Sequence, residues 1–252
     1  MSVKPAVRSL LAALLVCAFS GALAHANVSS ATISPSSARI SPSLDPSRLG
    51  AEGALRFDIS FAGGEFGIPV PVRRAILRFP AGLGIEIPEL RSCAPTRLRS
   101  MGARGCAAPS QLGHGSALAE ARLGSQFVTE KIALWVFLGP ISGAQPTLEI
   151  LAQGYTPFRE RVVLHGTVIS AKAPFGEELV LSIPSIPTLP LEPDASIVNL
   201  SITLGSSEPR LARDANTVLV PTSCPLGGFP FAAEFAYADG SSSNALVMTP
   251  CP

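Results

Sequence analysis

Apolar residues occupy every second position in two stretches near the start of the chain. In the first stretch the apolar side chains are Leu55, Phe57, Ile59 and Phe61. Residues 72–79 repeat the pattern, with arginines between the apolar positions. Because successive side chains of a strand point to opposite faces, both stretches are predicted to be half-buried β-strands.

Residues 132–138 are apolar on both faces and include Trp135, the single tryptophan. This pattern predicts a central strand that is covered on both sides. Further strands are predicted at 147–153, 161–170, 178–183, 196–204, 217–220, 229–237 and 244–249. In the strand at 196–204, one face is predicted to carry Val198, Leu200, Ile202 and Leu204. Asp239-Gly240, between the last two strands, predicts a hairpin turn.

Many short strands separated by turn residues are typical of an all-β protein. We therefore expect an antiparallel β-sandwich, immunoglobulin-like or jelly-roll-like, over residues 51–252, as one domain or as two packed sub-domains. One short helix is predicted at 95–101, because Pro95 suits the first helical position and Gly102 suits a helix end.

The first 26 residues have the pattern of a secretory signal peptide. A basic start precedes an apolar run at 9–23 and a small-x-small motif that ends at Ala26. Cleavage near Ala26 predicts a secreted protein or one at the extracellular cell surface. The alternative, lipidation of Cys17, conflicts with the bulky Val16 before it. No later apolar run is long enough to predict a transmembrane segment in the mature chain.

Two segments are rich in proline. Residues 27–50 are rich in Ser and Pro and bury little apolar surface, so a linker or an edge segment is expected there. Prolines also recur at every third position, the period of a polyproline II helix, in Pro184, Pro187, Pro190 and Pro193. This strip is interpreted either as a stiff crossover between two strands or as a docking strip for a partner.

Four cysteines remain once Cys17 leaves with the signal peptide. They allow three pairings, and proximity in the sequence favours Cys93 with Cys106 and Cys224 with Cys251. The first disulfide would bracket the predicted helix, and the second would close the C-terminal hairpin. Disulfides also favour an oxidising compartment.

The chain has 19 Lys and Arg against 18 Asp and Glu, without a basic stripe, so no nucleic-acid partner is expected. No cofactor or metal is predicted either. The chain lacks a His-Glu-x-x-His motif, and its cysteines are spaced too widely for a zinc site. A calcium loop at Asp239 would lack a second acidic residue, which favours a simple hairpin turn.

Candidate catalytic groups are few. His114 lies in Gly113-His114-Gly115-Ser116, which resembles an oxyanion-loop motif, but the chain has no Gly-x-Ser-x-Gly nucleophile elbow. A secreted hydrolase using His114 and Ser116 is therefore an alternative without an acid partner. His165 is interpreted as a surface or hydrogen-bonded strand histidine. Glu177 and Glu178 are adjacent on a strand, so they would point to opposite faces and could not flank one bond.

A carbohydrate-binding module of the cell envelope is a second alternative, because exposed aromatic rings stack on sugars. Tyr155 is the best candidate for ligand binding among the aromatic residues, although a tyrosine packed at a strand end fits the same pattern.

Several motifs resemble those of exported β-rich proteins of GC-rich actinobacteria. They are Cys93-Ala94-Pro95, the run from Cys106 through Leu112 to Ala117, Ser223 to Phe231, and Pro250-Cys251-Pro252. The resemblance extends from about residue 55 to the end of the chain. It implies export and the same cysteine pairing, but that group has no assigned activity and so supplies no catalytic residue. We expect a secreted or cell-surface, non-catalytic structural or binding protein whose partner is a cell-envelope polysaccharide or protein.

Overall fold

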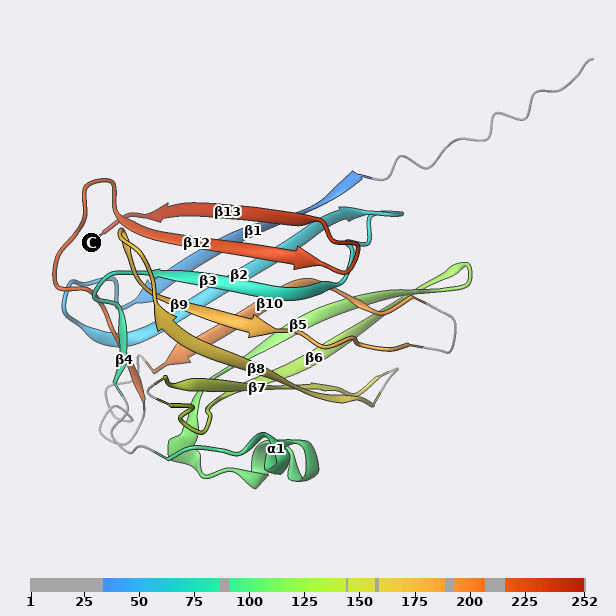
Figure 1. Ribbon diagram of the computed structural model, residues 1–252, viewed down its shortest axis with the longest axis horizontal. Coiled ribbons are helices and arrows are strands. Elements are labelled where there is room, and N and C mark those ends of the chain that lie inside the picture. Colours follow the sequence, from blue (N-terminus) through green and yellow to red (C-terminus); the bar gives the residue numbers. More distant parts are fainter. Residues whose placement is uncertain are drawn as a thin grey trace, which may run out of the picture. The chain divides into compact units, whose positions relative to one another are not determined.

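The computed structural model describes residues 34–86, 91–143, 145–156, 159–188, 193–206 and 216–251. The predicted signal peptide lies outside these residues. The described strands all belong to one large antiparallel sheet (Figure 1). Among the described residues, no helix has the length and apolar character needed to cross a membrane.

The strands are β1 (Ser34–Asp45), β2 (Glu52–Gly64), β3 (Val72–Pro80), β4 (Gly84–Glu86), β5 (Gln111–Leu123), β6 (Gln126–Leu138), β7 (Thr147–Gly154), β8 (Arg161–Ser170), β9 (Phe175–Ser182), β10 (Ser196–Gly205), β11 (Thr217–Leu219), β12 (Phe229–Tyr237) and β13 (Ser242–Thr249). All their pairings are antiparallel. The helix α1 spans Pro95–Met101, and two short 3-10 turns follow it at Ala103–Gly105 and Ala108–Ser110. The predicted helix is therefore confirmed.

Consecutive strands β5 to β9 lie side by side as a meander in the middle of the sheet. On one flank follow β10, β2 and the edge strand β1, and on the other follow β3, β12 and the edge strand β13. The two edge strands also contact each other. The sheet is therefore folded over, so that its flanks face each other across one interior (Figure 1).

Aromatic side chains on the inner face show how the flanks pack. Phe57 of β2 lies 6.2 Å from Phe79 of β3 and 6.1 Å from Phe231 of β12, measured between ring centroids. Since β2 is not a neighbour of β3 or β12 in the sheet, these contacts cross the interior. The predicted β-sandwich and the inward faces of its first two predicted strands are confirmed.

Strand β6 is apolar on both faces, as predicted for residues 132–138. Its inner side chains, such as Leu134 and Val136, belong to the main core. On its outer face, Phe137 and Trp135 pack with Leu98 of α1 in a second, smaller core. The helix segment therefore covers the outer face of the central strands.

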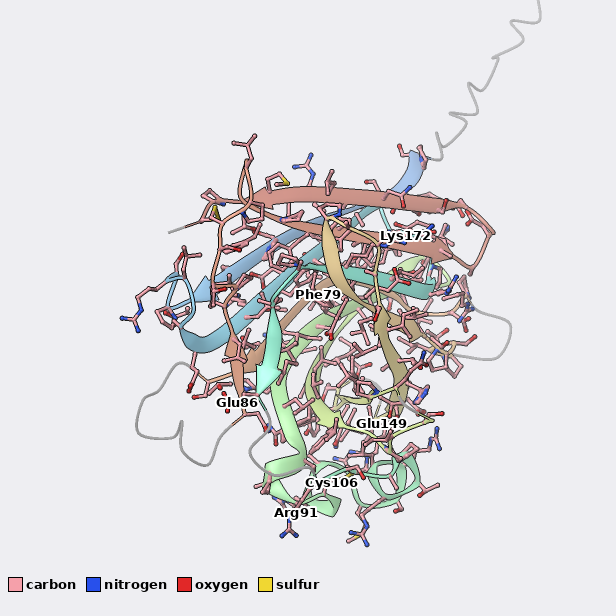
Figure 2. All side chains as sticks on the ribbon, turned by 60° about the vertical axis from the view of Figure 1, so that its left-hand side comes forward. Phe79, Glu86, Arg91, Cys106, Glu149 and Lys172 are labelled. Atoms are coloured by element: carbon pink, nitrogen blue, oxygen red, sulfur yellow. A yellow bond between two sulfur atoms is a disulfide. The ribbon has the colours of Figure 1, made fainter. Side chains whose placement is uncertain are left out.

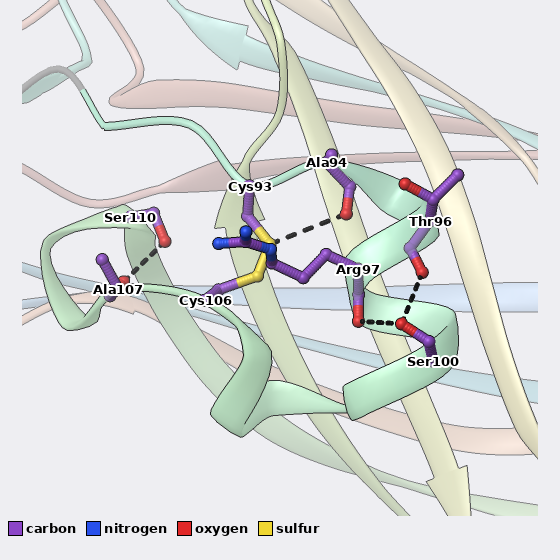
Figure 3. Close-up of a disulfide and its surroundings, with 8 residues drawn as sticks. All are labelled: Cys93, Ala94, Thr96, Arg97, Ser100, Cys106, Ala107 and Ser110. Atoms are coloured by element: carbon purple, nitrogen blue, oxygen red, sulfur yellow. Dashed lines mark hydrogen bonds between the residues drawn. A yellow bond between two sulfur atoms is a disulfide. The ribbon is translucent and has the colours of Figure 1, made fainter.

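The two predicted disulfides are confirmed. Cys93 bonds to Cys106, with their Cα atoms 5.6 Å apart, and Cys224 bonds to Cys251, with theirs 5.9 Å apart. Figure 3 shows the first disulfide beside α1. The same segment is attached to the sheet by the Cys93 amide, which donates to the Leu138 carbonyl, and by Arg161, which donates to the Arg99 and Ser100 carbonyls.

Of the linker and the edge segment considered for residues 27–50, the edge segment agrees with the structure, because residues 34–45 form the edge strand β1. Two features depart from the sequence expectations. Strand β5 was not predicted, because its inner positions carry Gly and Ala instead of large apolar residues. In β10 an irregularity between Ile197 and Asn199 shifts the register, so that Ile197 packs against the main core in place of Val198.

Candidate functional site

The folded-over sheet encloses three apolar cavities, which we call the interior cavities. Their volumes are about 90, 40 and 60 Å³. The first and second share lining residues that include Leu77, Ile150 and Leu200. The second and third share Leu55 and Phe79 among others. The three cavities therefore follow one another along the interior.

The first cavity is the largest of the three, and it exists because small side chains point inward there. Ala75 of β3, Ala117 of β5 and Ala152 of β7 all line the first cavity, where larger apolar residues would fill it. An apolar cavity has no groups to hold water, so it stays dry and offers its surface to an apolar ligand.

The first cavity reaches the surface at one end of the sheet. We call this opening the mouth, and its lining includes Glu130, Gly154, Glu160, Pro184 and Ile186. Glu160 and Pro184 are exposed side chains, so the cavity is continuous with the surface there. The third cavity, at the opposite end, is lined by Leu83 and Ile85 from around β4 and by Val218 of β11. Glu177, which also lines the third cavity, is exposed, so the interior reaches the surface at that end as well.

An inward carboxylate lies near each end of the interior. Glu130 belongs to the inner face of β6, which is otherwise apolar through Ile132 and Leu134. At the opposite end, Glu177 lines the third cavity, and partial burial raises the pKa of its carboxyl group. Glu178, next in sequence, points outward and pairs with Arg78 at 2.9 Å, as expected for adjacent residues of one strand.

The outer face carries a separate polar groove of about 610 Å³ over β1, β2, β10, β5 and β6. Ser41, Asp58, Ser201 and Ser116 lie in register across four neighbouring strands. Burial acts to raise the pKa of Asp58, but hydrogen bonds from Arg56 and Ser201 and the charge of Arg56 outweigh it and leave this pKa below its usual value. The groove offers hydroxyls, amides and charges, but no aromatic side chain among its described lining residues.

His114 and Ser116 both lie on the outer face of β5 and are exposed. The residues opposite His114 are Trp135 of β6 and Thr203 of β10. Within the described part of the chain, no carboxylate pairs with His114. The structure therefore brings together the base and hydroxyl of the hydrolase alternative without an acid.

The histidine that does pair with an acid is His165. Its Nδ1 lies 2.8 Å from Oε1 of Glu149, and only 1% of the Glu149 side chain is exposed, against 55% for His165. Figure 2 shows Glu149 on the side of the molecule that carries the Cys106 segment. Ser182 of β9 lies opposite His165 in the sheet. The reading of His165 as a hydrogen-bonded strand histidine agrees with this geometry, whereas nothing in the sequence singled out Glu149.

Of the remaining candidates, Pro184 lines the mouth, whereas Tyr155 and Asp239 are not among the lining residues of the interior cavities. Tyr155 is exposed after the end of β7, with 51% of its surface accessible. Asp239 accepts hydrogen bonds from the amide and hydroxyl of Ser241 in the β12–β13 hairpin, which lowers the pKa of Asp239. Pro184 begins the crossover from β9 to β10, and Pro190 of the proline strip lies outside the described residues. No group of three His, Cys, Asp or Glu side chains in the described ranges could hold a metal ion.

Comparison with known proteins gave no match: no family model, no curated protein and no solved structure matches this chain.

Proposed function

We propose that this chain is an exported, non-catalytic binding protein that holds a slender apolar molecule, such as an alkyl chain, in its interior cavities. The observation that carries this proposal is the row of three apolar cavities, which reaches the surface at the mouth. Two disulfides and the signal-peptide pattern support export.

The dimensions of the cavities favour a linear ligand. Each cavity is smaller than the 300 Å³ or so of an ordinary small-molecule site, so a bulky ring system would not enter without large shifts of the core. An extended chain could occupy all three in succession after small rotamer changes. Its methylene groups would gain contacts that the cavity walls now lack.

A chain-length series tests the proposal. Each methylene moved from water into an apolar site is worth about 0.8 kcal/mol, which corresponds to about fourfold in affinity. We expect the affinity for primary alkyl alcohols, measured by calorimetry, to rise by about this factor per carbon and then to level off once the cavities are full.

Two variants test whether the ligand binds in the first cavity. Ala117→Leu should weaken it at least tenfold, because the larger side chain fills the first cavity. Ala133→Leu makes the same change on the outer face of β6 and should leave the affinity unchanged. A flat chain-length series, or equal effects of the two variants, would contradict the proposal. So would turnover in a hydrolase panel that is lost on His114→Ala.

A second candidate function is binding of a saccharide in the polar outer groove. The observation that favours it is the row of hydrogen-bonding side chains across β1, β2, β10 and β5. A glycan array, read with two variants, tests whether a saccharide binds in this groove or at Tyr155. Signal lost on Asn199→Ala but kept on Tyr155→Ala would support the groove, and the reverse would support Tyr155. No signal from any glycan would remove this candidate.

A further inference from the structure

We propose that the saccharide bound in the polar outer groove is acidic, a linear chain of sugar units that carry carboxylates. This inference rests on the second candidate function, because it names the chemical class of the ligand for the same groove. It does not depend on the interior cavities, which lie on the other face of the sheet. It assigns both the charge and the extended shape of the ligand.

Two exposed cations stand at opposite ends of one row of the groove. The row crosses five neighbouring strands through Arg39 of β1, Ser60 of β2, Asn199 of β10, Leu118 of β5 and Lys131 of β6. All five residues line the groove. Since neighbouring strands are about 4.8 Å apart, the four gaps place the Cα atoms of Arg39 and Lys131 roughly 19 Å apart along the sheet. One small anion cannot reach both, whereas an extended ligand with several negative charges can.

The positive charge of these two side chains is not neutralised in the groove. Asp58 is the single carboxylate among the described lining residues, and it is held by Arg56, whose Nε atom lies 2.9 Å from its Oδ2 atom. Glu120, on the same face of β5, does not line the groove. Within the part of the chain that the structure describes, neither Arg39 nor Lys131 forms an ion pair. The groove therefore attracts an anionic ligand.

Hydrogen-bonding side chains occupy the space between the two cations. Ser60 and Asn199 lie in the same row, and the next row contributes Ser41, Ser201 and Ser116. Hydroxyl and amide groups both donate and accept hydrogen bonds, which suits the hydroxyls of a sugar. The described lining has no aromatic side chain, so it lacks the stacking that single-stranded nucleic acids use. The groove thus combines groups for sugar hydroxyls with charges for acidic substituents.

The experiment compares three probes by calorimetric titration of the chain without residues 1–26, at pH 7 and low ionic strength. The probes are hexagalacturonate, its fully methyl-esterified form and hexaglutamate. The ester has the same sugar chain without the charges, and the peptide has the charges without the sugar. We expect hexagalacturonate to bind about tenfold more tightly than either. Salt at about 1 M should remove most of its advantage over the ester, because it screens exposed charges.

Two substitutions in the groove locate the charges that matter. An exposed ion pair changes affinity by up to about fivefold. We therefore expect Arg39→Gln and Lys131→Gln each to weaken the binding of hexagalacturonate by about threefold, and the double variant by about tenfold. Binding of the ester should stay within about twofold of the wild type in all three variants.

Lys172→Gln is the matched control, because Lys172 is exposed in the turn between β8 and β9 and does not line the groove. It should leave the affinity for hexagalacturonate unchanged, and equal weakening by Lys131→Gln and Lys172→Gln would overturn the inference. Equal affinities for hexagalacturonate and its ester, both lost on Asn199→Ala, would also overturn it but leave the second candidate function standing. Hexaglutamate bound as tightly as hexagalacturonate, or no binding of any probe, would overturn both.

Discussion

The buried carboxylate of Glu149 depends on one exposed partner. It is the single charged side chain in the buried class among the described residues, and His165 is its hydrogen-bond partner at 2.8 Å. A buried acid with such a limited set of partners is a costly feature, since most of its hydration is lost. The contribution of the Glu149–His165 pair to stability can therefore be tested by replacing either residue.

His165→Ala should lower the free energy of unfolding by about 1–3 kcal/mol, because Glu149 would stay buried without its partner. Urea unfolding at neutral pH measures this loss. Thr167→Ala, two residues along the same strand, is the control and should change the stability by no more than about 0.5 kcal/mol. Adding Glu149→Leu to His165→Ala should restore part of the loss, and a double variant less stable than His165→Ala would argue against this account.

Glu177 gives a prediction on pH dependence. Its pKa is raised by burial, so the folded state holds the proton at pH values where the unfolded state, with a pKa of about 4.3, has lost it. The folded state therefore loses stability as the pH rises above this value. Glu177→Gln removes the titration, so the variant should be more stable than the wild type at pH 7 and equal to it below pH 4.

Glu178→Gln is the control for that experiment, because Glu178 forms an ion pair with Arg78 and should gain nothing at pH 7. Identical pH profiles for Glu177→Gln and the wild type would show that burial does not perturb this carboxyl group. Sequence reasoning predicted that these two residues point to opposite faces. It could not predict that one of them would line an interior cavity.

Among the elements, the α1 segment was the most predictable and the small-residue strands the least. Pro95 and Gly102 define the ends of α1 through local backbone preferences, which do not depend on the rest of the fold. Strand β5, in contrast, carries Gly113, Gly115 and Ala117 at inner positions, where no strong strand-forming residue marks it. It forms because β6 and β10 pair with it on both sides.

The Cys93–Cys106 disulfide should hold α1 on the outer face of the sheet. Replacing both cysteines by serine should cost about 3 kcal/mol, a typical value for a loop of this length. Trp135 reports the docking, because it packs in the small core with Leu98. Its emission should shift to the red in this double variant. The Cys224→Ser/Cys251→Ser variant should leave the emission of the folded protein unchanged, and a shift in both would contradict a local role.

On the scale of the whole molecule, one sheet makes both layers and thereby the interior. Most strands could be predicted from alternation, but their order could not. The pairing of β2 with β10, or of β3 with β9 and β12, joins segments far apart in the sequence. The cavities depend on that order, because they arise where small residues of separate strands face each other. Their existence is therefore a property of the fold that no local pattern reveals.

The molecule also has an apolar patch on its outer surface, which competes with the interior as a place for an alkyl chain. Leu226, Leu246 and Met248 are all exposed beside the β12–β13 pair and line a shallow groove. A chain bound there would show affinity without entering the fold. The affinity of the wild-type chain alone does not separate the two locations, whereas contacts between the ligand and side-chain methyl groups do.

The central claim is that an alkyl chain enters the folded-over sheet. Its most direct test is an NMR measurement of intermolecular nuclear Overhauser effects between unlabelled 1-decanol and the labelled methyl groups of Ile, Leu, Val and Met in the chain without residues 1–26. The account predicts contacts to Ile132, Leu134 and Leu200, which line the first cavity. Contacts confined to Leu226, Leu246 and Met248 would contradict it.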